Sequence, residues 1–141
     1  MKKFFLYLFI MFSFNALAAS EKQTVTPDVT LTNTYWKLVD IDTKVITRSE
    51  KLREPYFMLK EQNQLNGFTG CNRFFGSYTT QDNNINFSGV GMTRMMCQET
   101  MELERSFSKV IQEATHFKIQ GEKLQLFNNT KLIASFRAVY F

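Results

Sequence analysis

The segment from Gly91 to Glu104, GMTRMMCQETMELE, holds three methionines and one cysteine within six residues. Thioether and thiolate sulfur are ligands that Cu(I) prefers. A candidate soft-metal site therefore comprises Met92, Met95, Met96 and Cys97. The competing interpretation is that flexible methionine side chains fill an irregular core where a loop meets a helix. We favour packing, because residue type alone is weak support for a metal site, and we expect no cofactor.

The first 18 residues have the three parts of a secretory signal peptide. The compartment that they indicate bears on whether the cysteines form a disulfide. A positive start at Lys2 and Lys3 precedes an apolar run from Phe4 to Phe14, and small residues precede a cut after Ala18. The run is shorter than the roughly 20 residues of a membrane span, so cleavage is favoured over an uncleaved anchor. No cysteine lies near the cut. We expect an exported protein, periplasmic or secreted, not lipid-anchored, with no membrane span after cleavage.

Cleavage leaves residues 19–141, in which 19–33 are polar and predict a flexible leader. Residues 34–141 then form one domain, with enough chain for a hydrophobic core. The formal charge of the whole chain is +4, and removing Lys2 and Lys3 lowers it to +2. The remaining lysines and arginines are not clustered, which argues against a nucleic-acid partner. We expect a monomer.

Cys71 and Cys97 are the two cysteines of the chain. In an exported domain two cysteines predict one disulfide, which would be worth roughly 3–4 kcal/mol through loop closure. A redox-active pair is an alternative, because Arg73 and Arg94 lie nearby and cations lower a thiol pKa. Free buried thiols are another. We favour the structural bond, because the cysteines do not form a Cys-x-x-Cys motif and no histidine is adjacent.

Asn72, Arg73 and Arg94 are the polar residues around the cysteines. Arg94 has the geometry to bind a carboxylate or a phosphate through two hydrogen bonds. Alternatively it bonds loop carbonyls or pairs with a buried acid, which we favour because buried polar groups are usually satisfied in this way.

Catalytic residues are poorly represented, and we expect no enzyme. His116 is the one histidine of the chain, and Ser77 lacks the flanking pattern of a nucleophile elbow. No phosphate-binding glycine loop occurs, and no carboxylates are paired at a telling spacing. Glu102 and Glu104 are best interpreted as a solvated first turn of a helix.

Short strands with turn residues between them make up most of the domain. TYWKLVDID alternates and predicts a strand with Trp36 and Leu38 inward. YFMLKE, CNRFFGSYTT and NINFSG predict further strands, and the segment from His116 to Phe141 predicts an antiparallel meander. Asn66-Gly67 predicts a tight bend or bulge. Further candidates for inward side chains are Phe74, Tyr78, Ile85 and Phe87.

One amphipathic helix interrupts the strands. Its apolar stripe at helical spacing comprises Met101, Leu103, Phe107, Val110, Ile111 and Ala114. Roughly seven or eight strands with tight turns favour a mainly β, antiparallel sheet that curls, with the helix closing a face or an open end.

Two motifs, GCNRFFGSY and MTRMMC, followed by this helix, resemble the META/HslJ-like domain family. The resemblance covers the chain from about Thr34 to Phe141, and its motif residues are Asn72, Arg73, Phe74, Thr93, Arg94, Met95 and Met96 together with both cysteines. It implies a partly open, barrel-like antiparallel sheet with one helix, and an envelope location. Some members are associated with heat shock, antibiotic tolerance or motility, and no established reaction comes with the family.

These observations favour a non-enzymatic envelope protein that binds another protein or an apolar ligand and acts in stress tolerance or envelope maintenance. The alternative is a periplasmic copper-handling or thiol-redox protein that uses residues 92–101. A third hypothesis is an accessory subunit or inhibitor of an envelope machine.

Overall fold

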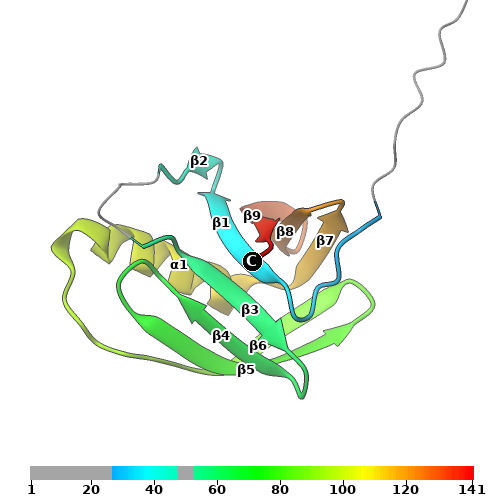
Figure 1. Ribbon diagram of the computed structural model, residues 1–141, viewed down its shortest axis with the longest axis horizontal. Coiled ribbons are helices and arrows are strands. Elements are labelled where there is room, and N and C mark those ends of the chain that lie inside the picture. Colours follow the sequence, from blue (N-terminus) through cyan, green and yellow to red (C-terminus); the bar gives the residue numbers. More distant parts are fainter. Residues whose placement is uncertain (1–26, 48–52) are drawn as a thin grey trace, which may run out of the picture.

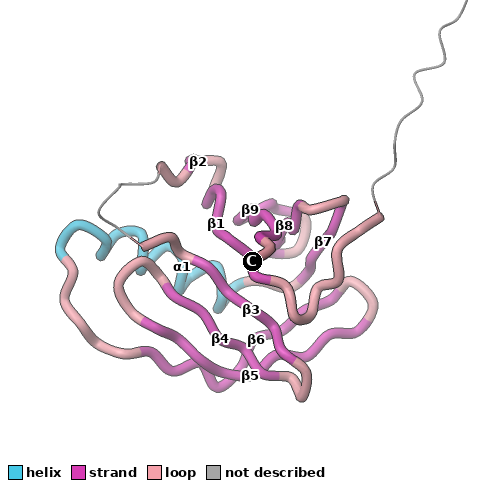
Figure 2. The backbone as a smooth tube through the Cα atoms, viewed as in Figure 1, coloured by secondary structure: helices cyan, strands magenta, loops and turns pink. Residues whose placement is uncertain are grey.

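The structure is a computed structural model that describes residues 27–47 and 53–141, and Figure 1 follows this part of the chain from β1 to β9. The strands are β1 Tyr35–Ile41, β2 Lys44–Val45, β3 Tyr56–Lys60, β4 Gln64–Phe68, β5 Arg73–Gln81, β6 Asn84–Met92, β7 His116–Gln120, β8 Lys123–Asn128 and β9 Lys131–Val139. A 3-10 turn at Gln98–Thr100 leads into the helix α1, Met101–Glu113. In the chain this helix connects β6 to β7, and Figure 2 shows it behind β3 and β4 in this view.

The strands form one antiparallel sheet that closes into a barrel, because β9 pairs with β1 along most of its length. β2 lies outside the ring as a short arm on β1. The weakest join is between β6 and β7, which share a single residue pair, Asn84 with His116. The predicted barrel-like antiparallel sheet with one helix is confirmed, but the barrel is closed where a partly open one was expected.

Aromatic and aliphatic side chains fill the barrel interior. The Phe57 and Phe136 rings meet edge to face at 4.8 Å, and Phe107 of α1 meets Phe74 in the same manner at 5.4 Å. Edge-to-face contacts of this kind add to the hydrophobic gain of burial. Trp36 and Leu38 are buried as predicted, as are Phe74, Tyr78 and Ile85, whereas Phe87 is half-buried. The helix buries Phe107, Val110 and Ile111 of its predicted stripe.

The bend predicted at Asn66-Gly67 is wrong, because both residues lie inside β4. The turn before β4 is made by Gln62 and Asn63, which both have positive φ. Gly67 serves a different purpose: a Cβ there would overlap the Phe74 ring and lie 2.7 Å from the carbonyl oxygen of Tyr56. The glycine therefore allows close packing inside a strand.

The ordered domain begins before Thr34, where the flexible leader was expected to end. Val29 and Leu31 pack against the core, and the Trp36 indole nitrogen donates a hydrogen bond to the Leu31 carbonyl at 2.9 Å. Thr32 also bridges to Leu59 of β3. The predicted signal peptide, residues 1–18, lies outside the described residues. Across the part that is described, no helix is long and apolar enough to cross a membrane.

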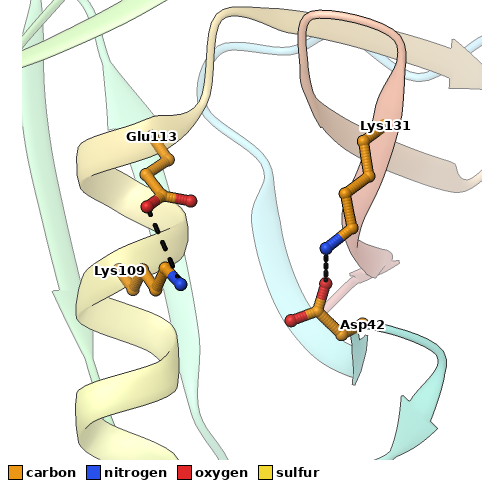
Figure 3. A network of polar contacts seen from close by, with 4 residues as sticks. All are labelled: Asp42, Lys109, Glu113 and Lys131. Carbon is orange, nitrogen blue, oxygen red and sulfur yellow. Dashed lines mark ion pairs between the residues drawn. The ribbon is translucent and has the colours of Figure 1, made fainter.

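Two ion pairs at the surface are drawn in Figure 3. Lys131 and Asp42 meet at 2.9 Å and join the start of β9 to the turn after β1. Lys109 and Glu113 meet at 3.9 Å within α1. Exposed pairs of this kind are worth about 0–1 kcal/mol, so the hydrophobic interior dominates the stability of the barrel.

Candidate functional site

The cysteines form a disulfide that joins the β4–β5 connection to the entry of α1. Cys71 and Cys97 have Cα atoms 5.9 Å apart and are separated by 26 residues in the chain. Cys71 is buried, and Cys97 is half-buried. The structure therefore contains the structural disulfide that the sequence favoured. In the disulfide neither sulfur is available as a thiolate.

Asn72 is the centre of a polar cluster beside the disulfide, and its side chain is 1% exposed. The amide oxygen accepts hydrogen bonds from the Thr93 hydroxyl at 2.9 Å and the Met95 backbone nitrogen at 2.7 Å. The amide nitrogen donates to the Met95 carbonyl at 3.0 Å and to the Glu104 carboxylate at 2.9 Å. One side chain therefore holds together the first motif, the second motif and the helix.

Thr69 completes this cluster from the end of β4. Its hydroxyl donates to the Glu104 carboxylate at 2.7 Å and accepts the Asn72 backbone N–H at 3.0 Å. Gly70 follows with a φ of 104°, a conformation that favours glycine. We call Thr69, Cys71, Asn72, Cys97 and Glu104 the motif cluster.

The prediction that Glu104 is solvated is wrong, whereas Glu102 is exposed as expected. Glu104 is half-buried and meets donors from both Thr69 and Asn72. The signal was available in the spacing, because Glu104 lies three residues before Phe107 and seven before Ile111, on the buried side of the helix.

The methionines of the second motif divide between core and surface. Met92 packs against the core, but Met95 is 62% exposed and Met96 is 82% exposed. The interpretation that all of them fill the core is therefore wrong for these two. Phe75, from the first motif segment, is also exposed, and its ring lies over Gly91, where a Cβ would come within 2.9 Å of the ring.

Arg73 and Arg94 are exposed as well. Within residues 27–47 and 53–141 neither guanidinium forms a hydrogen bond or an ion pair, so the pairing of Arg94 with a loop carbonyl or a buried acid stays a prediction. The Thr93 backbone N–H donates a hydrogen bond to the Arg73 carbonyl, and the Arg73 backbone N–H donates one to the Thr93 hydroxyl, which places the two motif segments side by side. We call the exposed side chains of these segments the motif surface: Arg73, Phe75, Arg94, Met95 and Met96.

Thioether, aromatic, guanidinium and amide groups are among the side-chain groups of this site. The described residues include no group of three or more histidine, cysteine, aspartate or glutamate side chains that could hold a metal ion. His116 lies on β7, where its Nδ1 is 2.8 Å from the Thr115 hydroxyl. The motif cluster is internally satisfied, and the motif surface exposes thioether, aromatic and guanidinium groups.

A closed antiparallel barrel with a disulfide-linked pair of loops at the entry of its helix is the architecture that these residues build. The META domain family model matches residues 29–140, and the chain belongs to this family. The resemblance of the two motifs is thereby confirmed.

Relatives extend the comparison. The chain is 25% identical over 128 residues to heat shock protein HslJ of Escherichia coli (strain K12), covering 89% of each protein. A protein from Burkholderia xenovorans solved by NMR shares the fold with a TM-score of 0.67 at 21% identity, over 79% of this chain and 85% of that one. A DUF4847 family protein from Bacteroides vulgatus ATCC 8482 has a TM-score of 0.53 at 11% identity, over 76% of this chain and 93% of that one.

Proposed function

We propose that this protein is an exported, non-enzymatic envelope factor that binds partially unfolded or partner proteins through its motif surface, and so contributes to stress tolerance. The observation that carries the proposal is the exposure of Met95 and Met96 beside a rigid, disulfide-linked cluster. Flexible, polarizable methionine side chains suit surfaces that accept varied apolar partners.

The barrel interior argues for a surface of this kind over an internal ligand site. Trp36, Phe57 and Phe107 are each 0% exposed and occupy the interior. An apolar ligand or a protein segment therefore binds on the outside, where the motif surface contributes the exposed apolar side chains of Phe75, Met95 and Met96. The heat-shock name of the E. coli relative supports a role in stress.

Export is supported by the signal-peptide pattern and by the disulfide, since such bonds persist in oxidising compartments. Intact mass of the protein taken from an envelope extract tests this part. A chain beginning at Ala19 and about 2 Da lighter than the reduced form is expected, from loss of two thiol hydrogens. A chain that retains residues 1–18 in the cytoplasm would contradict export.

Light scattering from a thermally denaturing client enzyme tests binding. The purified protein should suppress scattering, and Met95→Ser with Met96→Ser should abolish the suppression. Val45→Ser is the matched control, because Val45 is 71% exposed on β2 and lies outside the motif segments. No suppression by the wild type at several-fold excess, or equal loss in the control, would contradict the proposal.

Copper handling is the alternative function, because the thioethers of Met95 and Met96 are exposed and thioether sulfur is a ligand that Cu(I) prefers. The variant Met95→Leu with Met96→Leu separates it, because leucine retains the apolar side chain and removes the sulfur. Client suppression that survives this variant supports protein binding. Cu(I) binding by the wild type that the variant loses, with suppression absent in both, supports metal handling.

A further inference from the structure

A second surface lies on the outer face of β8, β9 and β1, away from the motif residues. It is a groove of about 810 Å³, a volume within the range of small-ligand sites. Its walls are the segment before β1, the β7–β8 turn and Tyr140. Figure 1 shows the segment before β1 running beside the end of β7.

Backbone hydrogen bonds hold these walls in place. Gly121 in the β7–β8 turn donates to the Asp28 carboxylate at 2.6 Å and accepts the Val29 N–H at 3.0 Å. The next residue, Glu122, accepts the Ala138 N–H at 2.9 Å. The turn is thereby fixed to the N-terminal segment on one side and to β9 on the other. A groove formed in advance loses little conformational entropy when a ligand binds.

Two cations line the groove at directly opposite positions. Lys123 of β8 pairs in register with Arg137 of β9, and like charges placed directly opposite each other destabilise a sheet. Neither side chain has an ion-pair partner within the described residues. By contrast, Lys37, the next residue across from Arg137, is neutralised by Glu54 at 2.6 Å. Two adjacent cations are thus left available to an anionic group.

The floor of the groove contains a polar residue, Ser135, beside the apolar Val39 and Phe136. Ser135 is 1% exposed, and its hydroxyl makes no hydrogen bond within the described residues.

Asp40 provides the opposite charge across this floor. It pairs in register with Ser135, which places it diagonally from Arg137, and it forms no ion pair with a described residue. The register shifts between Leu38 and Asp40, so Val39 is a bulge residue at the groove. Bulges are frequent beside sites because they redirect side chains.

We propose that this groove binds a short zwitterionic peptide, with its carboxylate on Lys123 and Arg137 and its ammonium group on Asp40. The charged residues lining the groove are Asp40, Glu122, Lys123 and Arg137, so the two signs balance. A ligand with only one sign of charge meets repulsion from half of them, whereas a dipolar ligand complements both. The apolar side chains of Val29 and Val39 accommodate the body of the peptide.

Isothermal titration of the purified protein with trialanine tests the proposal. Trialanine should bind, and N-acetyl-trialanine amide, which has neither charge, should bind at least about tenfold more weakly. N-acetyl-trialanine, which keeps only the carboxylate, should be intermediate. No heat with trialanine, or equal affinity for the fully blocked peptide, would overturn the proposal.

Variants assign each end of the peptide. Lys123→Gln with Arg137→Gln should weaken trialanine and N-acetyl-trialanine alike, whereas Asp40→Asn should weaken trialanine alone. The matched control is Lys118→Gln with Arg105→Gln, two exposed cations on β7 and α1, which should leave both affinities unchanged. Equal effects of the control and groove variants would overturn the assignment. Failure here leaves the client assay unaffected, because that assay depends on Met95 and Met96.

Discussion

The motif cluster and the groove over β9 differ in whether their charged side chains have partners. In the motif cluster the Glu104 carboxylate is half-buried and meets donors from Thr69 and Asn72. In the groove, Lys123 and Arg137 lie side by side without an acid partner in the described chain. Polar groups that satisfy one another stabilise the fold, whereas polar groups left unmatched on a preformed surface are available to a ligand. The two regions therefore have different expected responses to mutation.

Removing the disulfide should have the largest effect of the changes considered. Cys97→Ser should lower the free energy of unfolding by about 2–5 kcal/mol, because the unfolded chain regains the freedom of the loop between residues 71 and 97. Urea denaturation under non-reducing conditions measures the loss. Wild-type protein in reductant should lose a similar amount. An unchanged urea midpoint for the variant would show that the disulfide does not stabilise the fold.

Asn72→Ala should lower the free energy of unfolding by about 2–3 kcal/mol, because it removes hydrogen bonds to the Glu104 carboxylate and to the Met95 backbone. Arg137→Gln is the counterpart from the groove. It relieves repulsion from Lys123 and should change the stability by less than about 0.5 kcal/mol. Urea denaturation measures both variants. Equal losses of unfolding free energy would contradict the view that the motif cluster stabilises the fold and the groove does not.

Tyr35 alternates with the buried Trp36 on β1, and its ring stacks on Tyr56 of β3. Burial, and then the Glu54 carboxylate, raise the pKa of Tyr35 above its ordinary value of 10.0. The unfolded chain therefore releases this proton first, so the stability that Tyr35 contributes is complete below about pH 10 and falls as the pH rises further. Melting temperatures at about pH 9 and about pH 11 should diverge less in Tyr35→Phe than in the wild type. The same alkaline loss in both would contradict this origin.

Asp42→Asn should have a small effect, below about 1 kcal/mol, because the Asp42–Lys131 pair of Figure 3 is exposed. The difference between variant and wild type should shrink further in salt. A larger loss in urea denaturation would mean that the turn after β1 contributes more than its exposed ion pair suggests.

Much of the fold was predictable from local pattern. The two-residue period in YWKL identified Trp36 and Leu38 as inward, because a strand alternates its faces. Gly67 was misinterpreted, since a turn dipeptide was inferred where the real constraint is the ring of Phe74 on the neighbouring strand. Such a constraint is absent from any short window of sequence.

The site was predictable only in part, for the same reason. Cysteine count and compartment indicated the Cys71–Cys97 bond. The partnership of Asn72 with Glu104 spans 32 residues, so no local rule predicts it. Met95 and Met96 were expected to pack because methionine usually does, but the hydrogen bonds of the Met95 backbone to Asn72 fix the loop, and both side chains are exposed.

The single residue pair between β6 and β7 has a consequence for self-association. Beyond this join β6 behaves as the edge of an open sheet, and exposed edges invite pairing with a second copy and growth into fibres. Two features of β6 disfavour such growth. Asn86 and Ser88 are polar and exposed. Gly89, with a φ of 59°, lies in a bulge that disrupts a flat edge. Protection from aggregation is thus built into the strand at the weakest join of the barrel.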